Sequence, residues 1–147
     1  MISIYTIGFS KKSLREFITR LKSAGVRKVI DVRLHNTSQL AGYAKKEDLE
    51  YVLELAGIAY EHRPELAPTE ELLKGYKSGE ITWPEYEKVY GDLLAKREPL
   101  KSLDFEKLRQ EGPVCLLCAE DRPDRCHRRL LAEYYRDRLP EVEIGHL

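Results

Sequence analysis

The sequence has no long apolar run and no recognisable export signal. None of its apolar stretches approaches the roughly 20 residues that a transmembrane helix needs. Its first residues, MISIYTIGFS, have neither the basic start nor the small-residue cleavage site of a signal peptide. We therefore expect a cytoplasmic protein without a membrane partner.

An excess of one charge is also missing. Lysine plus arginine and aspartate plus glutamate both number 25, and no long run carries a single sign. This balance argues against a general binder of nucleic acids, although a local basic patch would still be compatible with a nucleic-acid partner.

At 147 residues, the chain fits one domain, residues 1–147, and is long enough to bury a substantial hydrophobic core.

Cysteine is scarce and odd in number. Three cysteines in a chain expected to be cytoplasmic argue against a disulfide framework. Each cysteine is then a reactive thiol, a metal ligand or a core residue. Cys115 and Cys118 form a CxxC pattern inside an apolar run, where they would point to opposite faces of a strand, so they make a poor metal chelate. We expect Cys115 to be a core residue.

Short apolar runs alternate with segments of helical periodicity along the chain. We expect strands at residues 2–7, 26–33, 58–62, 114–118 and 142–144. We expect helices at residues 12–25, 46–56, 103–108 and about 126–138, and two more that begin at Thr69 and at Thr82. Ser13 with Glu16, and Thr82 with Glu85, are capping pairs at the starts of their helices. This order predicts a three-layer α/β fold around a mostly parallel, five-stranded, doubly wound (Rossmann-like) sheet, with a helical crossover insertion at residues 63–112.

The carboxyl ends of parallel strands form the crevice in which such folds bind ligands. The common doubly wound order, third-second-first-fourth-fifth, would place Thr6–Ser10 beside Cys118–Glu120. The segment CAEDRPDRCHR, residues 118–128, would then bridge a buried strand and a helix N-terminus. Backbone N–H groups at a helix N-terminus favour anions and thiolates.

Reactive side chains are concentrated in that segment. If Asp124 caps the helix, Cys126 and His127 lie in the first turn, where the dipole and nearby arginines favour a thiolate. Cys118 is either a second reactive thiol or a small buried residue. Glu120 could serve as a general base, orient His127 or pair with an arginine, and His127 could be a base, a ligand or a cap.

Two arginines are candidates for anion binding. Arg33 follows Asp31 at the end of the second strand, where the two would also make a simple salt bridge. Arg128 binds an anion, makes an internal ion pair with Asp31 or Glu120, or is an ordinary exposed arginine of the first helical turn. A metal site would draw on four donors that lack the paired short spacings of zinc motifs: Cys118, Glu120, Cys126 and His127. We leave the metal and the cofactor unassigned.

Four stretches of the sequence identify a relationship: TIGFS, IDVRLHNTSQLAGYAKK, YEHRPELAPT and VCLLCAEDRPDRCHRRLLAEY. Together they resemble the DUF488 family of uncharacterised proteins, in a subgroup with the motifs DVRLxNTSQLAG and CxEDxPxxCHR. The family implies no established activity. The positions that match its shared pattern are Gly8, Ser10, Asp31, Arg33, Cys118, Glu120, Cys126, His127 and Arg128.

The residues and the resemblance together lead to a hypothesis and its alternatives. We expect a thiol-dependent enzyme acting on a small anionic, phosphate- or sulfur-bearing substrate, with Cys118, Glu120, Cys126 and His127 as catalytic residues. In this hypothesis Ser10, Arg33 and Arg128 bind the anion, and Gly8 and Asp31 support the site. The alternatives are a non-catalytic module that binds an anion, nucleotide or nucleic acid, and a metal-binding protein that uses the Cys/His cluster.

Overall fold

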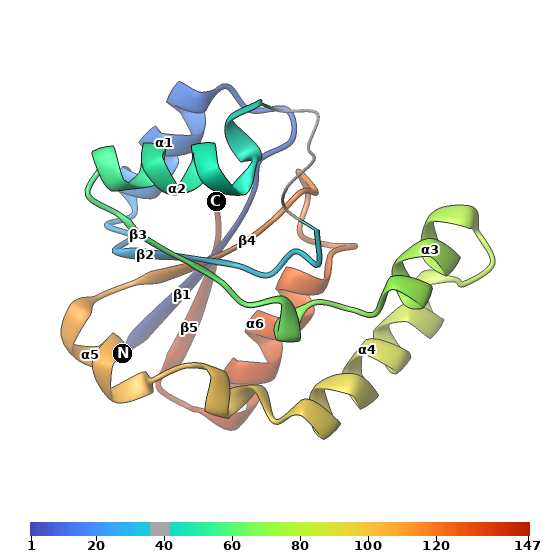
Figure 1. The fold of residues 1–147 in the computed structure, drawn as a ribbon. Coiled ribbons are helices and arrows are strands. Elements are labelled where there is room, and N and C mark those ends of the chain that lie inside the picture. Colours follow the sequence, from blue (N-terminus) through green and yellow to red (C-terminus); the bar gives the residue numbers. More distant parts are fainter. Residues whose placement is uncertain (36–41) are drawn as a thin grey trace.

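The structure is a computed structural model, and it describes residues 1–35 and 42–147. The segment NTSQLA of the DVRLHNTSQLAG motif, residues 36–41, therefore lies outside the described residues. The described chain forms one five-stranded sheet in which every neighbouring pair of strands is parallel (Figure 1). Its strands are β1 (Ile2–Gly8), β2 (Lys28–Asp31), β3 (Ala59–His62), β4 (Val114–Cys118) and β5 (Val142–His146). The predicted fold class is confirmed.

The strand order differs from the predicted one. The order is β3-β2-β4-β1-β5, so β4, and not β1, lies beside β2. Asp31 is in register with Leu117, and Gly8 is in register with Cys118. All five residues of β4 are apolar or cysteine and all are buried, and a strand of that kind is stable in the centre of a sheet covered on both faces. The expected neighbourhood of the ends of β1 and β4 is nevertheless confirmed.

Helices cover both faces of the sheet (Figure 1). Helices α1 (Leu14–Ser23) and α2 (Lys46–Leu55) pack on one face. The other face carries α3 (Glu70–Ser78), α4 (Trp83–Arg97), α5 (Phe105–Glu111) and α6 (His127–Arg138). Three short 3-10 helices connect these elements, at Gly42–Ala44, Pro64–Leu66 and Pro99–Ser102. In Figure 1, α3 and the start of α4 project beyond the edge of the sheet.

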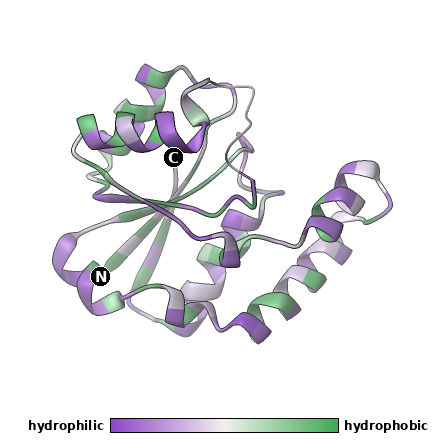
Figure 2. Cartoon of the chain, viewed as in Figure 1, coloured by the Kyte–Doolittle hydropathy of each residue, from purple (hydrophilic) through white to green (hydrophobic). Residues whose placement is uncertain are grey.

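The amphipathic pattern of the helices explains this packing. Figure 2 shows hydrophilic and hydrophobic segments alternating along α1 and α2. Phe17 and Leu21 of α1 lie one turn apart and are fully buried against the sheet. Burial of each such side chain contributes about 2 kcal/mol to folding. No helix in the described part of the chain is long and apolar enough to cross a membrane.

The predicted helix starts are confirmed at three places. The side chains of Ser13, Thr69 and Thr82 each accept a hydrogen bond from a backbone N–H three residues later. Other boundaries shift: β2 is shorter than residues 26–33, α5 begins after the cap Asp104, and β5 extends to His146. The local signals thus locate each element, while pairing with neighbours decides where strands end.

Candidate functional site

Two cysteines meet at the carboxyl edge of the sheet. Cys118 is the last residue of β4 and Cys126 precedes α6, and the two form a disulfide. The expectation that the cysteines stay unpaired was therefore wrong for this pair. An odd number of cysteines still allows one disulfide. The fold brings the end of β4 and the start of α6 together, and these positions carry Cys118 and Cys126. Cys115 is free and fully buried, as predicted, and burial raises the pKa of its thiol.

Helix α6 begins later than the sequence indicates. The expected N-cap was Asp124, but Cys126 occupies that position and makes no side-chain capping bond. The backbone N–H of Cys126 instead donates to the carbonyl of Pro123, which closes a turn immediately before the helix. His127 and Arg128 are therefore the first two helical residues, and their side chains point back to the ends of the strands.

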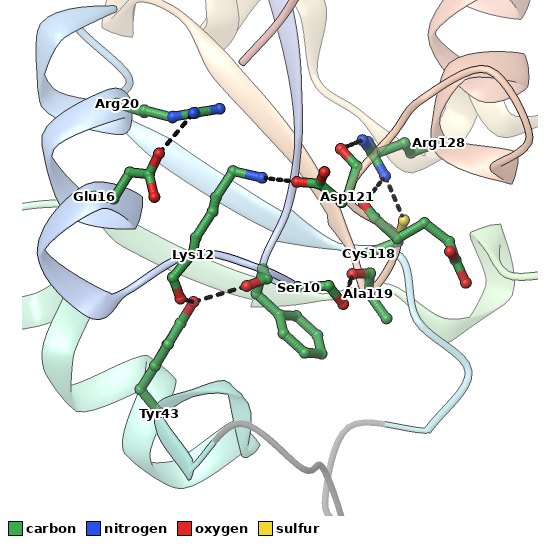
Figure 3. A network of polar contacts seen from close by, with 11 residues as sticks. Ser10, Lys12, Glu16, Arg20, Tyr43, Cys118, Ala119, Asp121 and Arg128 are labelled. Carbon is green, nitrogen blue, oxygen red and sulfur yellow. Dashed lines mark hydrogen bonds and ion pairs between the residues drawn. The ribbon is translucent and has the colours of Figure 1, made fainter.

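Arg128 connects this helix to the end of β4, as Figure 3 shows. Its Nη1 atom lies 2.9 Å from Cys118 Sγ and donates to the carbonyl of Glu120 at 2.6 Å, while Nη2 donates to the carbonyl of Asp121 at 3.2 Å. The side chain is 1% exposed, and burial lowers its pKa to about 10, so it keeps its charge at neutral pH. No described carboxylate forms an ion pair with it, so a positive charge remains beside Cys118.

His127 is held in one tautomer. Its Nε2 atom lies 2.7 Å from the carbonyl oxygen of Val32, which can only accept, so Nε2 carries the proton. The Nδ1 atom then presents a lone pair and lies 4.0 Å from Cys126 Sγ. Burial lowers the pKa of His127 to about 4, and the imidazole is therefore neutral at neutral pH.

Arg33 and Asp31 form a buried, bidentate ion pair. Arg33 donates to the two carboxylate oxygens at 2.8 and 2.7 Å, and Tyr60 donates its hydroxyl to Asp31 at 2.6 Å. Burial alone would raise the pKa of Asp31, but these bonds hold it below its usual value. The predicted salt bridge is thus observed. Tyr60 was not predicted, because only the pairing of β3 with β2 brings it there.

One edge of the Arg33 guanidinium remains unused. Its Nη1 atom is buried and has no hydrogen-bond partner among the described residues, although the whole residue is only 5% exposed. The guanidinium also lies over the ring of Phe9, with 5.1 Å between its carbon and the ring centre. Asp31 and Phe9 therefore fix a buried donor that lacks an acceptor.

Gly8 permits the close approach of two loops. A Cβ atom on Gly8 would lie 1.5 Å from the carbonyl oxygen of Glu120 and 3.2 Å from Arg128 Nη1. Any side chain at this position would displace the carbonyl that Arg128 binds. The absence of a side chain at Gly8 therefore allows the carbonyl of Glu120 to reach Arg128, and a supporting role of Gly8 in a functional site stays a prediction.

Ser10 lies beside the site but uses its hydroxyl internally. The hydroxyl donates to the carbonyl of Ala119 at 2.5 Å, which joins the loop after β1 to the loop after β4 (Figure 3). Lys12 strengthens the same connection through a bond of 2.8 Å to Asp121. Lys12 was not predicted as a site residue, because a lysine at the start of a helix usually faces solvent.

Glu120 lies apart from the residues it was expected to assist. Its carboxylate is exposed and makes no hydrogen bond or ion pair within the described part of the chain. The group that orients His127 is the carbonyl of Val32. Glu120 still lines a pocket at the carboxyl edge of the sheet, where its carboxylate can reach a ligand.

A pocket of about 820 Å³ opens at this edge of the sheet. It lies between the ends of β2 and β4, the start of α6, and the pair of helices α3 and α4. Five of the predicted residues line it: Arg33, Cys118, Glu120, Cys126 and His127. The lining does not include the other four predicted residues, Gly8, Ser10, Asp31 and Arg128. A smaller pocket beside β3 contains none of the predicted residues.

The other wall of the pocket comes from the helical crossover between β3 and β4. Tyr76 of α3 and Tyr86 of α4 line the pocket together with Ile81 from the intervening turn. Tyr86 also packs into the core and is 3% exposed. Its place in the pocket wall depends on how α3 and α4 pack against the rest of the fold, and the sequence pattern does not show this packing.

Metal binding receives no geometric support at this cluster. Among residues 1–35 and 42–147, no group of three histidine, cysteine, aspartate or glutamate side chains is arranged to hold a metal ion. Both sulfurs are engaged with each other, and the protonated Nε2 atom of His127 is bound to a carbonyl. The four donors expected from the sequence therefore do not form a ligand set.

Comparison with known proteins defines the family and no further property. Residues 13–135 match the family described as "Domain of unknown function DUF488". No curated protein and no solved structure matches the chain. The matched segment covers well over half of the sequence and includes Arg33 and the whole stretch from Cys118 to Arg128. The chain therefore belongs to the DUF488 family.

Proposed function

We propose that this protein is a thiol-dependent enzyme that acts on a small anionic substrate in the pocket at the carboxyl edge of the sheet. The observation that carries this proposal is the pair of sulfurs, Cys118 and Cys126, bonded to each other with Arg128 Nη1 at 2.9 Å from Cys118. In the reduced protein, this buried guanidinium lowers the pKa of the Cys118 thiol. Cys118 is then the nucleophile and Cys126 the second thiol.

The reaction is a two-electron reduction of the substrate. The Cys118 thiolate attacks an electrophilic atom of the substrate, forms a covalent bond to it, and expels a leaving group with its electron pair. The Cys126 thiolate then attacks Cys118 Sγ, forms the disulfide, and releases the substrate fragment with the other electron pair. Both leaving groups take up protons, and a low-molecular-weight thiol returns the disulfide to the dithiol.

Three further residues have roles in this scheme. The unpaired Nη1 atom of Arg33 binds the anionic group of the substrate. The lone pair of His127 Nδ1, 4.0 Å from Cys126 Sγ, accepts a hydrogen bond from the Cys126 thiol and orients it toward Cys118, and the proton passes to solvent before the thiolate attacks. Glu120, at the rim of the pocket, donates a proton to the leaving group or takes one from solvent.

Equilibration with glutathione buffers tests whether the cysteine pair is redox-active. We expect the Cys118–Cys126 bond to open and close reversibly at a potential above about −300 mV, the limit below which structural disulfides resist glutathione. Peptide mass spectrometry identifies the linked cysteines, and Cys115→Ser is the control that should leave the transition unchanged. A pair that stays oxidised in every buffer would be a structural bridge, and the enzyme proposal would fail.

The second candidate is a non-catalytic anion-binding module. The unpaired donor of Arg33 favours it, because this donor needs neither sulfur to bind an anion. Binding of phosphate to the Cys118→Ser/Cys126→Ser variant, combined with an inert cysteine pair in the wild type, would select this candidate.

A further inference from the structure

We infer that the ligand of this pocket is an oxyanion attached to an aromatic ring, with the oxyanion at Arg33 and the ring against Tyr76 and Tyr86. The inference rests on the proposed function insofar as the pocket is the substrate site. It adds the chemical class of the substrate.

Size is the first argument. The pocket holds about 820 Å³, which lies within the range of roughly 300–1,000 Å³ in which proteins enclose whole organic ligands. A bare phosphate or sulfate ion would fill a small part of this volume. The pocket therefore fits an anion with a sizeable organic body.

Charge at the sheet end of the pocket gives the position of the anion. Arg33, which follows β2, and Arg125, which precedes α6, line the pocket on the side of the sheet, and Lys77 lines it from α3. Glu120 is the only carboxylate among the described lining residues. Asp31 neutralises part of the charge of Arg33 but leaves Nη1 as a fixed donor. Asp31 fixes the plane of the guanidinium, so an oxyanion that reaches Nη1 accepts a hydrogen bond of defined direction.

The opposite wall suits an aromatic ring. The ring centres of Tyr76 and Tyr86 lie 5.2 Å apart at an angle of 54°, and Trp83 stacks on Tyr86 with 4.9 Å between centres and 19° between planes. This arrangement fixes the two tyrosine rings that line the pocket. A planar ligand ring gains contact area and quadrupole attraction from such a wall.

The turn between α3 and α4 packs against α3 and adds Ile81 to the tyrosine wall. A Cβ atom on Gly75 would lie 2.4 Å from the Cδ1 atom of Ile81, so the glycine lets the turn between α3 and α4 fold back against α3. Ile81 thereby lies beside Tyr76 and Tyr86 in the pocket wall. The hydroxyl of Tyr86 has no hydrogen-bond partner within the described residues, and it can bind a polar substituent of the ring.

Calorimetric titration of three probes tests the inference: phenyl phosphate, inorganic phosphate and phenol. The protein is the Cys118→Ser/Cys126→Ser variant, so that binding is measured without thiol chemistry. We expect phenyl phosphate to bind at least tenfold more tightly than either other probe. Tyr76→Leu should remove this advantage without weakening phosphate binding, whereas Tyr51→Leu, a change of an exposed tyrosine on α2, should alter neither.

Two results would overturn the inference. One is equal affinity of phenyl phosphate and inorganic phosphate, and the other is no binding of phenyl phosphate at all. The glutathione titration of the wild-type protein reports separately on the cysteine pair. A redox-active pair combined with either result would overturn the ligand class and leave the proposed function standing.

Discussion

His127 Nε2 lies 2.7 Å from the carbonyl oxygen of Val32, so the first residue of α6 is bound to the chain just after β2. The next carbonyl, that of Arg33, is bound in the same way by His62 Nε2 at 2.8 Å. Two imidazoles thus fix the segment that carries Arg33 into the pocket. One comes from α6 and the other from β3, which makes the position of Arg33 dependent on the whole sheet edge.

This role of His127 predicts a pH dependence of stability. Burial lowers the pKa of His127 to about 4, whereas the unfolded chain has the ordinary value of about 6.5. Between these values the unfolded chain binds a proton that the folded protein does not, so stability falls as the pH falls from 6.5 to 4. The total loss is about 3 kcal/mol once the pH lies below both pKa values.

Denaturant unfolding at pH 7 and pH 4.5 measures this contribution. His127→Gln, which retains a side-chain donor for Val32, should lose most of the difference between the two pH values. His35→Gln changes an exposed histidine and should keep the wild-type difference. An unaltered pH dependence in the His127 variant would contradict the buried, neutral imidazole.

Gly8→Ala should destabilise the protein by about 2–3 kcal/mol, because the new methyl group overlaps the carbonyl of Glu120. Gly91→Ala is the matched control, since a Cβ atom on this α4 glycine meets nothing within 4 Å. That change should be neutral or stabilising by up to about 1 kcal/mol. Thermal unfolding of both variants checks the contrast, and equal effects would refute the close approach at Gly8.

Arg128→Lys should raise the pKa of the Cys118 thiol in the reduced protein, because lysine cannot keep both the contact with the sulfur and the bonds to the two loop carbonyls. The pH midpoint of Cys118 alkylation reports the change. Arg129→Lys is the control, since Arg129 pairs with Glu133 on the same helix. A shift of the same size in both variants would contradict a specific role of the Arg128 guanidinium.

Local sequence signals predict the elements of this fold better than their arrangement. Apolar runs and the caps Ser13, Thr69 and Thr82 specify strands and helix starts within a few residues. The central position of β4 depends on which strand is buried on both faces, and this follows from contacts between distant segments. Asp124 resembles an N-cap, but the turn that Cys126 makes with Pro123 starts the helix later.

The candidate site also has some residues that the sequence predicts and some features that only the folded structure shows. Cys118, Cys126, His127 and Arg128 are close in sequence, and Asp31 and Arg33 end one strand, so motif reasoning finds both groups. The disulfide, the role of Tyr60 and the tyrosine wall of the pocket require tertiary contacts.

The most direct test of the account is the pH dependence of alkylation of each cysteine in the reduced, folded protein, read by peptide mass spectrometry. The account predicts that Cys118 reacts with a midpoint well below the value of about 8.5 for a free thiol, and that Cys126 follows at higher pH. Buried Cys115 is the internal reference and should stay unreactive. A Cys118 that reacts only at or above that value, or not at all, would contradict the central claim that Arg128 activates its thiol.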